Sequence, residues 1–74
     1  MPHYSFNNQD ITIDILMKME EVTRLIAKLL KKPFDEVLGM FYASQTFAAL
    51  KNTESGMWAE SAQFIADDFF REKN

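Results

Sequence analysis

A chain of 74 residues accommodates one domain, and the absence of cysteine excludes disulfides and thiol-based zinc sites as sources of stability. With 47% hydrophobic residues and a net charge of −3, the composition indicates a globular, acidic protein and disfavours non-specific binding to phosphate backbones. Because domains of this size are marginally stable, we expect efficient packing or a protein partner to complete the stability.

The first nine residues, MPHYSFNNQ, are polar and typical of turns, so they predict a loose arm over 1–9 within a single helical domain spanning 1–74. They contain neither the basic region nor the apolar run of a signal peptide. No stretch of the chain approaches the ~20 apolar residues that a membrane span needs. We therefore expect a cytoplasmic protein that does not contact a membrane.

Apolar residues with a helical period predict a first helix over 10–31, beginning near Asn8 or Asp10, which are both favourable N-cap types. One face, within about 100° of the helical wheel, carries most of them. These residues are Ile11, Ile15, Met19, Val22, Ile26, Leu29 and Leu30. Pro33 ends this helix, because the residue before a proline avoids helical geometry.

Pro33 also suits the first position of a second helix over 33–43, which the short link makes antiparallel to the first. The apolar phase slips after Phe41, which predicts a bend near Ser44 and a short third helix over 45–51 that Ser44 caps.

The segment NTESG that follows is a turn by composition, with Gly56 as its residue of positive φ. Ser61 is a favourable cap for a last helix over 61–71, which carries Ala62, Ile65, Ala66 and Phe69 on its inner face, and residues 71–74 are expected to fray. The predicted fold is all-α, a compact bundle of four short helices of which the first is the longest.

Residues suited to catalysis are sparse. The single histidine, His3, lies in the predicted arm, and adjacent carboxylates such as Asp67 and Asp68 point about 100° apart on a helix. Two glycines exclude a glycine-rich phosphate loop, and no calcium-loop motif is present. The sequence therefore predicts a binding protein that is not an enzyme and holds no cofactor or metal.

A DNA-binding regulator of the helix-turn-helix type is the alternative that several short helices suggest. Such a module needs a recognition helix with exposed basic or amide side chains. The predicted third helix offers only Gln45, Lys51 and Asn52 around an apolar middle, and the chain is acidic. A nucleic-acid partner is therefore not expected.

A second group of apolar residues predicts an interaction surface. Ile13, Leu16 and Met17 lie about 100–160° from the centre of the main apolar face of the first helix, and Phe64 lies similarly off the inner face of the last. Two interpretations remain open. Either Met57, Trp58 or the N-terminal arm covers this group, or a homodimer or a larger protein partner does.

A family resemblance rests on the run FYASQTFAALKNTESGMWAES, which is followed by Phe64 and Ile65. It resembles a family of short helical proteins of unknown function from gut-type bacteria, and the resemblance covers about two thirds of the chain. The recurring positions are Phe41, Tyr42, Ser44, Thr46, Leu50, Glu54, Gly56 and Ser61. The resemblance implies a compact helical domain, in some relatives the small member of a two-protein module of toxin–antitoxin type, and it assigns no functional residues. Lys32, where a serine or aspartate cap is usual, and Asn52-Thr53, in place of an acidic residue and proline, depart from the pattern.

Overall fold

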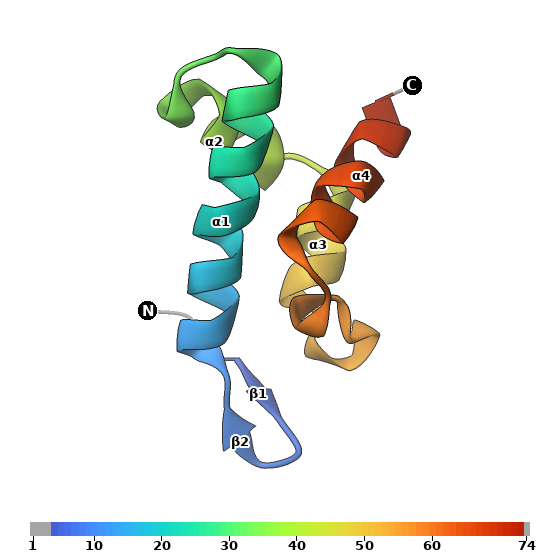
Figure 1. Cartoon of the computed structure of the whole chain (residues 1–74). Coiled ribbons are helices and arrows are strands. Elements are labelled where there is room, and N and C mark those ends of the chain that lie inside the picture. Colours follow the sequence, from blue (N-terminus) through green and yellow to red (C-terminus); the bar gives the residue numbers. More distant parts are fainter. Residues whose placement is uncertain (1–3, 74) are drawn as a thin grey trace.

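The structure, a computed structural model, describes residues 4–73, and within this range the chain forms four α-helices (Figure 1). The helices are α1 (Thr12–Leu30), α2 (Phe34–Tyr42), α3 (Gln45–Lys51) and α4 (Ala62–Lys73). The all-α prediction is confirmed, with α1 the longest helix. Two short 3₁₀ turns, η1 (Thr53–Ser55) and η2 (Met57–Ala59), connect α3 to α4.

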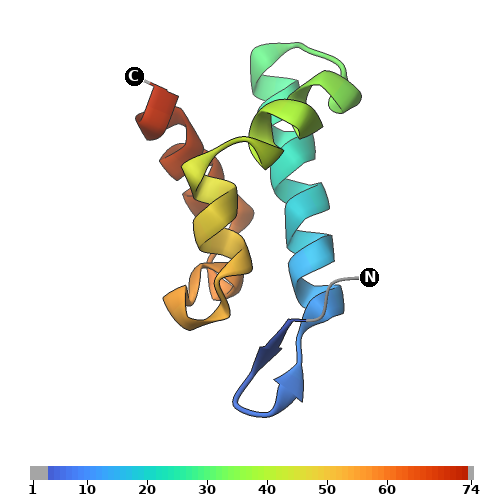
Figure 2. The ribbon, with the colours of Figure 1, turned by 180° about the vertical axis from the view of Figure 1, so that it is seen from behind.

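The helices form two pairs around one core, α1 with α2 and α3 with α4. The chain reverses direction after α1, and α2 packs against the C-terminal part of that helix (Figure 1). A second reversal through η1 and η2 places α4 beside α3, and α4 packs along α1 (Figures 1 and 2). The core therefore lies between α1 on one side and the pair of α3 and α4 on the other.

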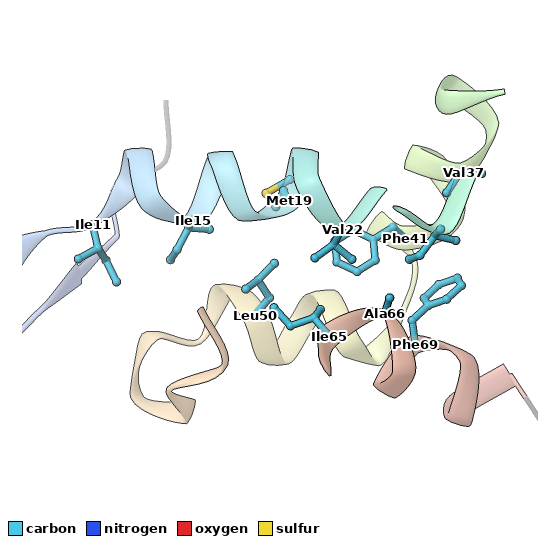
Figure 3. Packing of buried hydrophobic residues seen from close by; sticks show 11 residues of the cluster. Ile11, Ile15, Met19, Val22, Val37, Phe41, Leu50, Ile65, Ala66 and Phe69 are labelled. Carbon is cyan, nitrogen blue, oxygen red and sulfur yellow. The ribbon is translucent and has the colours of Figure 1, made fainter. Parts of the chain in front are cut away.

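The buried side chains come from all four helices and from the residue before α1 (Figure 3). Phe41 of α2 is fully buried, and its ring lies 5.6 Å from the Phe47 ring and 6.1 Å from the Phe69 ring between centroids. The buried hydrophobic residues are Ile11, Ile15, Met19, Val22, Ile26, Val37, Phe41, Leu50, Ile65, Ala66 and Phe69. The predicted inner faces of the first and last helices thus supply most of the core.

The boundaries between the first two helices differ from the prediction. Pro33 does not occupy the first helical position, since its ψ of 146° is extended and it precedes α2 as the N-cap residue. Lys31 ends α1 in the left-handed region, with φ at 57°, and its N–H donates to the Ala27 carbonyl. The backbone thus uses a left-handed residue to end α1 and leaves the proline in the link.

The predicted loose arm is wrong for residues 4–9, because the structure shows a β-hairpin there. The strands β1 (Ser5–Phe6) and β2 (Gln9–Asp10) pair antiparallel across a two-residue turn (Figure 1). Asn7 and Asn8 have φ of 53° and 64°, the positive values that a type I′ turn requires and that asparagine tolerates. His3 lies outside the described residues.

The hairpin also moves the start of α1. With Asn8 in the turn and Asp10 in β2, the helix begins at Thr12, and its N-cap residue Ile11 has no capping side chain. The Asp10 carboxylate still contributes to the start of α1, since its Oδ1 accepts a hydrogen bond from the Thr12 N–H at 3.0 Å.

Among the described helices, none combines the length and the apolar composition that a membrane span requires.

Candidate functional site

The four residues predicted to form an interaction surface differ in exposure. Ile13 is 64% exposed, Met17 57% and Phe64 44%, whereas Leu16 is half-buried and packs against the core. The structure therefore removes Leu16 from the predicted surface and leaves the other three accessible.

The three exposed residues do not share one face. At 100° per residue, Ile13 and Met17 lie about 150–170° from the centre of the buried face of α1, and Phe64 lies about 150° from that of α4. Figure 3 shows those two buried faces directed toward each other across the core. Ile13 and Met17 consequently lie on one side of the molecule and Phe64 on the opposite side, so the prediction of one joint surface is wrong.

Within residues 4–73, no other side chain covers Ile13 or Met17. Trp58 packs on the N-terminal hairpin, with its ring 5.6 Å from the Phe6 ring in an edge-to-face arrangement, and Met57 packs against the core. Both therefore close the end of the core beside the hairpin. Ile13 and Met17 remain uncovered, and we call these two residues the outer face of α1.

The positions of the family resemblance have identifiable roles in folding. Ser44 caps α3, since its Oγ accepts from the Phe47 N–H at 3.1 Å and donates to the Phe41 carbonyl at 2.6 Å. Gly56 has the predicted positive φ, 75°. The Ser61 Oγ accepts from the Phe64 N–H at 3.1 Å, as expected of a cap. The predicted bend near Ser44 and the predicted caps Ser44 and Ser61 are thus confirmed.

Tyr42 differs from the other motif positions because it is 50% exposed. Its ring packs edge-to-face on Phe47, with 4.9 Å between centroids, and the Lys51 ammonium lies 5.3 Å from the centroid of the same Phe47 ring. These contacts attach Tyr42 to the surface of α3. The residues described do not enclose a pocket here or elsewhere.

The densest polar cluster joins α3 to the end of α4. The Glu72 carboxylate accepts hydrogen bonds from the Gln45 N–H at 2.9 Å, the Thr46 N–H at 2.9 Å and the Thr46 hydroxyl at 2.8 Å. Asp68 Oδ2 lies 3.1 Å from the same hydroxyl oxygen. We call Ser44, Thr46, Asp68 and Glu72 the α3 clasp.

The α3 clasp satisfies the first three N–H groups of α3, two through Glu72 and one through Ser44. These hydrogen bonds, above all the one from the Gln45 N–H, hold the pKa of Glu72 below its usual value. The sequence predicted Ser44 but missed Glu72, which lies in the segment expected to fray, whereas α4 continues to Lys73. Partners 26 residues apart leave no local pattern in the sequence.

Side chains that could ligate a metal ion do not converge among the residues described. Residues 4–73 contain no group of three histidine, cysteine, aspartate or glutamate side chains placed to hold a metal ion. In the clasp, the Glu72 carboxylate caps α3, and the Asp68 carboxylate accepts from the Thr46 hydroxyl and pairs with Arg71.

The clasp also bears on the helix-turn-helix alternative. A recognition helix places its N-terminal residues against base edges in the major groove. In this chain the corresponding end of α3 is covered by the Glu72 carboxylate with Asp68 beside it, and negative charge at that position repels phosphate. The geometry of α3 therefore weighs against DNA binding.

The structure defines a small all-α domain whose accessible features are apolar side chains rather than a cleft. Comparison with protein-family models, curated proteins and solved structures finds no match.

Proposed function

We propose that the chain is a protein-interaction module, acting as a homodimer or as the small partner of a larger protein, and that the outer face of α1 makes the contact. The observation that carries this proposal is the exposure of Ile13 and Met17 on the solvent side of the longest helix. Exposed large apolar side chains are the kind of surface that association removes from water.

The surroundings of this face support the proposal. Ile13 and Met17 are one helical turn apart, so their side chains adjoin. Next along the same side lie Glu20 and Arg24, whose side chains form an exposed ion pair at 2.8 Å. An apolar centre with a charged rim is the usual composition of a protein–protein contact.

The setting we propose is the cytoplasm of a bacterium, on the basis of the composition and of the resemblance to short proteins from gut-type bacteria. In that family some members are the small part of a two-protein module. A larger protein that contacts the outer face of α1 would give this chain the same kind of role.

Substitution of a single exposed residue tests the proposal. Met17→Lys places a charge in the centre of the outer face, and Phe64→Lys is the matched control on the opposite side of the molecule. For a homodimer, sedimentation velocity is expected to show that M17K weakens association about tenfold or more, in the range of a single hot-spot residue, while F64K does not.

A hetero-complex is tested by site-specific photo-crosslinking in the producing cells. A photoreactive residue at position 17 is expected to yield one defined adduct that the same residue at position 64 does not yield. A monomer that forms no adduct through position 17 would refute the proposed contact.

The DNA-binding alternative has its own measurement. A mobility-shift titration with duplex DNA at moderate salt is expected to show no complex, because the chain is acidic and carboxylates cover the start of α3. A salt-dependent complex that Lys51→Glu abolishes would favour the alternative.

A further inference from the structure

We propose that the N-terminal hairpin, residues 4–10, is a strap that opens as a unit while the four helices stay folded, and that its opening uncovers Trp58. The closed strap acts as a built-in cover over this indole. The inference concerns the end of the molecule where the hairpin lies in Figure 1, and it is independent of the outer face of α1.

Contacts at Tyr4, Phe6 and Asp10 attach the strap to the body of the protein, and the Asp10 Oδ1 accepts from the Thr12 N–H at 3.0 Å. The aromatic anchor of the strap is the edge-to-face contact between Phe6 and Trp58. Its polar anchor is Tyr4, whose N–H donates to the Thr12 hydroxyl at 2.8 Å and whose carbonyl accepts from the Ile11 N–H at 2.9 Å. Both anchors are only partly buried.

The hairpin of the strap is itself only weakly stable, so it contributes little to keeping these contacts closed. Its ladder consists of two residue pairs, Ser5 with Asp10 and Phe6 with Gln9, and only Tyr4 and Phe6 within it are sheltered from solvent. None of its residues belongs to the fully buried core. A two-stranded hairpin is marginal in water, and a segment with few buried apolar contacts opens at a lower free energy than the whole domain.

Trp58 is held in place without the strap. Its Nε1–H donates to the Thr53 carbonyl at 3.1 Å, which fixes the indole against η1, and Met57 beside it packs on the core. After the strap opens, the indole thus remains positioned and presents its face to solvent.

Amide hydrogen exchange measured by NMR tests whether the strap opens separately. The Ile11 amide reports on the strap through its bond to Tyr4, and the Ile65 and Val22 amides report on the buried helices. In the unmodified protein we expect Ile11 to exchange at least about tenfold faster than the helix amides. Equal exchange rates at all three sites would overturn the proposal, because the strap would then open only by global unfolding.

Substitutions in the strap give the second measurement, in which Trp58 is the only tryptophan and so the only indole reporter. Phe6→Ala is expected to shift tryptophan emission to longer wavelength and to speed Ile11 exchange about tenfold, with unchanged helical circular dichroism. Phe34→Ala is the control and is expected to change neither signal, because it removes a partly exposed ring that contacts Arg24 of α1 rather than the strap.

Asn8→Gly provides a variant with the opposite effect, since Asn-Gly is the preferred pair in a type I′ turn. This variant is expected to slow exchange at Ile11 and leave the helix amides unchanged. Loss of helical signal in F6A together with no change at Ile11 in N8G would show that the hairpin is part of the cooperative core and would overturn the proposal.

Discussion

The α3 clasp and the N-terminal strap both join segments that are distant in sequence, yet they differ in the packing of the aromatic residues beside them. The clasp adjoins the cluster of Phe41 and Phe69, which solvent does not reach, and its hydrogen bonds satisfy the start of α3. The strap rests on the half-buried Phe6 at the edge of the core. We therefore expect substitutions on the clasp side to lower the free energy of unfolding more than substitutions in the strap, and this difference can be measured.

The largest effect is expected from removing an aromatic ring on the clasp side. Phe41→Ala leaves a cavity among α2, α3 and α4 and is expected to lower the free energy of unfolding by about 3–5 kcal/mol. Phe6→Ala, the same change in the strap, is expected to lower it by about 1 kcal/mol. Urea denaturation followed by circular dichroism compares the two, and equal losses would contradict the distinction drawn between the two regions.

Loss of a cap is expected to have a smaller effect. Ser44→Ala leaves the Phe47 N–H without its acceptor and is expected to cost about 1–2 kcal/mol, since the serine is buried. Ser61→Ala is the matched variant at the exposed start of α4, and we expect its cost to be about 0.5–1 kcal/mol. If S61A were the more destabilising variant in thermal melts, the buried Ser44 cap of the clasp would not contribute more to stability than the exposed Ser61 cap.

The pH dependence of stability is expected to show the contribution of Glu72. The folded-state pKa of this residue lies below its usual value, so its stabilisation is present above the usual glutamate pKa of about 4.3 and is lost as the pH falls through the lowered value. Glu72→Gln is expected to flatten the stability profile in acid while leaving the strap amides unchanged. Identical profiles for E72Q and the unmodified protein between about pH 6 and 3 would exclude this contribution.

The smallest effect on stability is expected at the outer face of α1, which belongs to neither attachment. Met17→Lys is expected to change the free energy of unfolding of the monomer by no more than about 0.5 kcal/mol, because the side chain is exposed and its neighbours are charged. Chemical denaturation at low protein concentration measures this value. A large loss of monomer stability would mean that Met17 serves the fold and would remove it from the proposed contact.

Sequence periodicity by itself determined the helical class, most of the buried residues of α1 and α4 and the positions of several caps. Leu29 is the exception on the predicted apolar face, since it is 53% exposed. Ile15, Val22 and Ile26 recur at helical spacing, and Ser44 and Gly56 act through backbone groups within a few residues. Helical spacing and caps depend on residues close together in the chain, so they can be predicted from a single sequence. The same periodicity placed Ile13 and Met17 away from the apolar face of α1, but it left open whether another part of the chain covers them.

Only the tertiary structure decided which distant residues meet. Glu72 reaches α3 from a segment that the sequence indicated would fray, and Phe6 reaches Trp58 from a segment that it indicated would be loose. The tertiary structure also separated Phe64 from Met17, because the packing of α1 on α4 fixes the sides toward which the outer faces of these two helices point. The physical reason is that each of these outcomes depends on how elements pack, and packing depends on the whole set of buried side chains rather than on any local pattern.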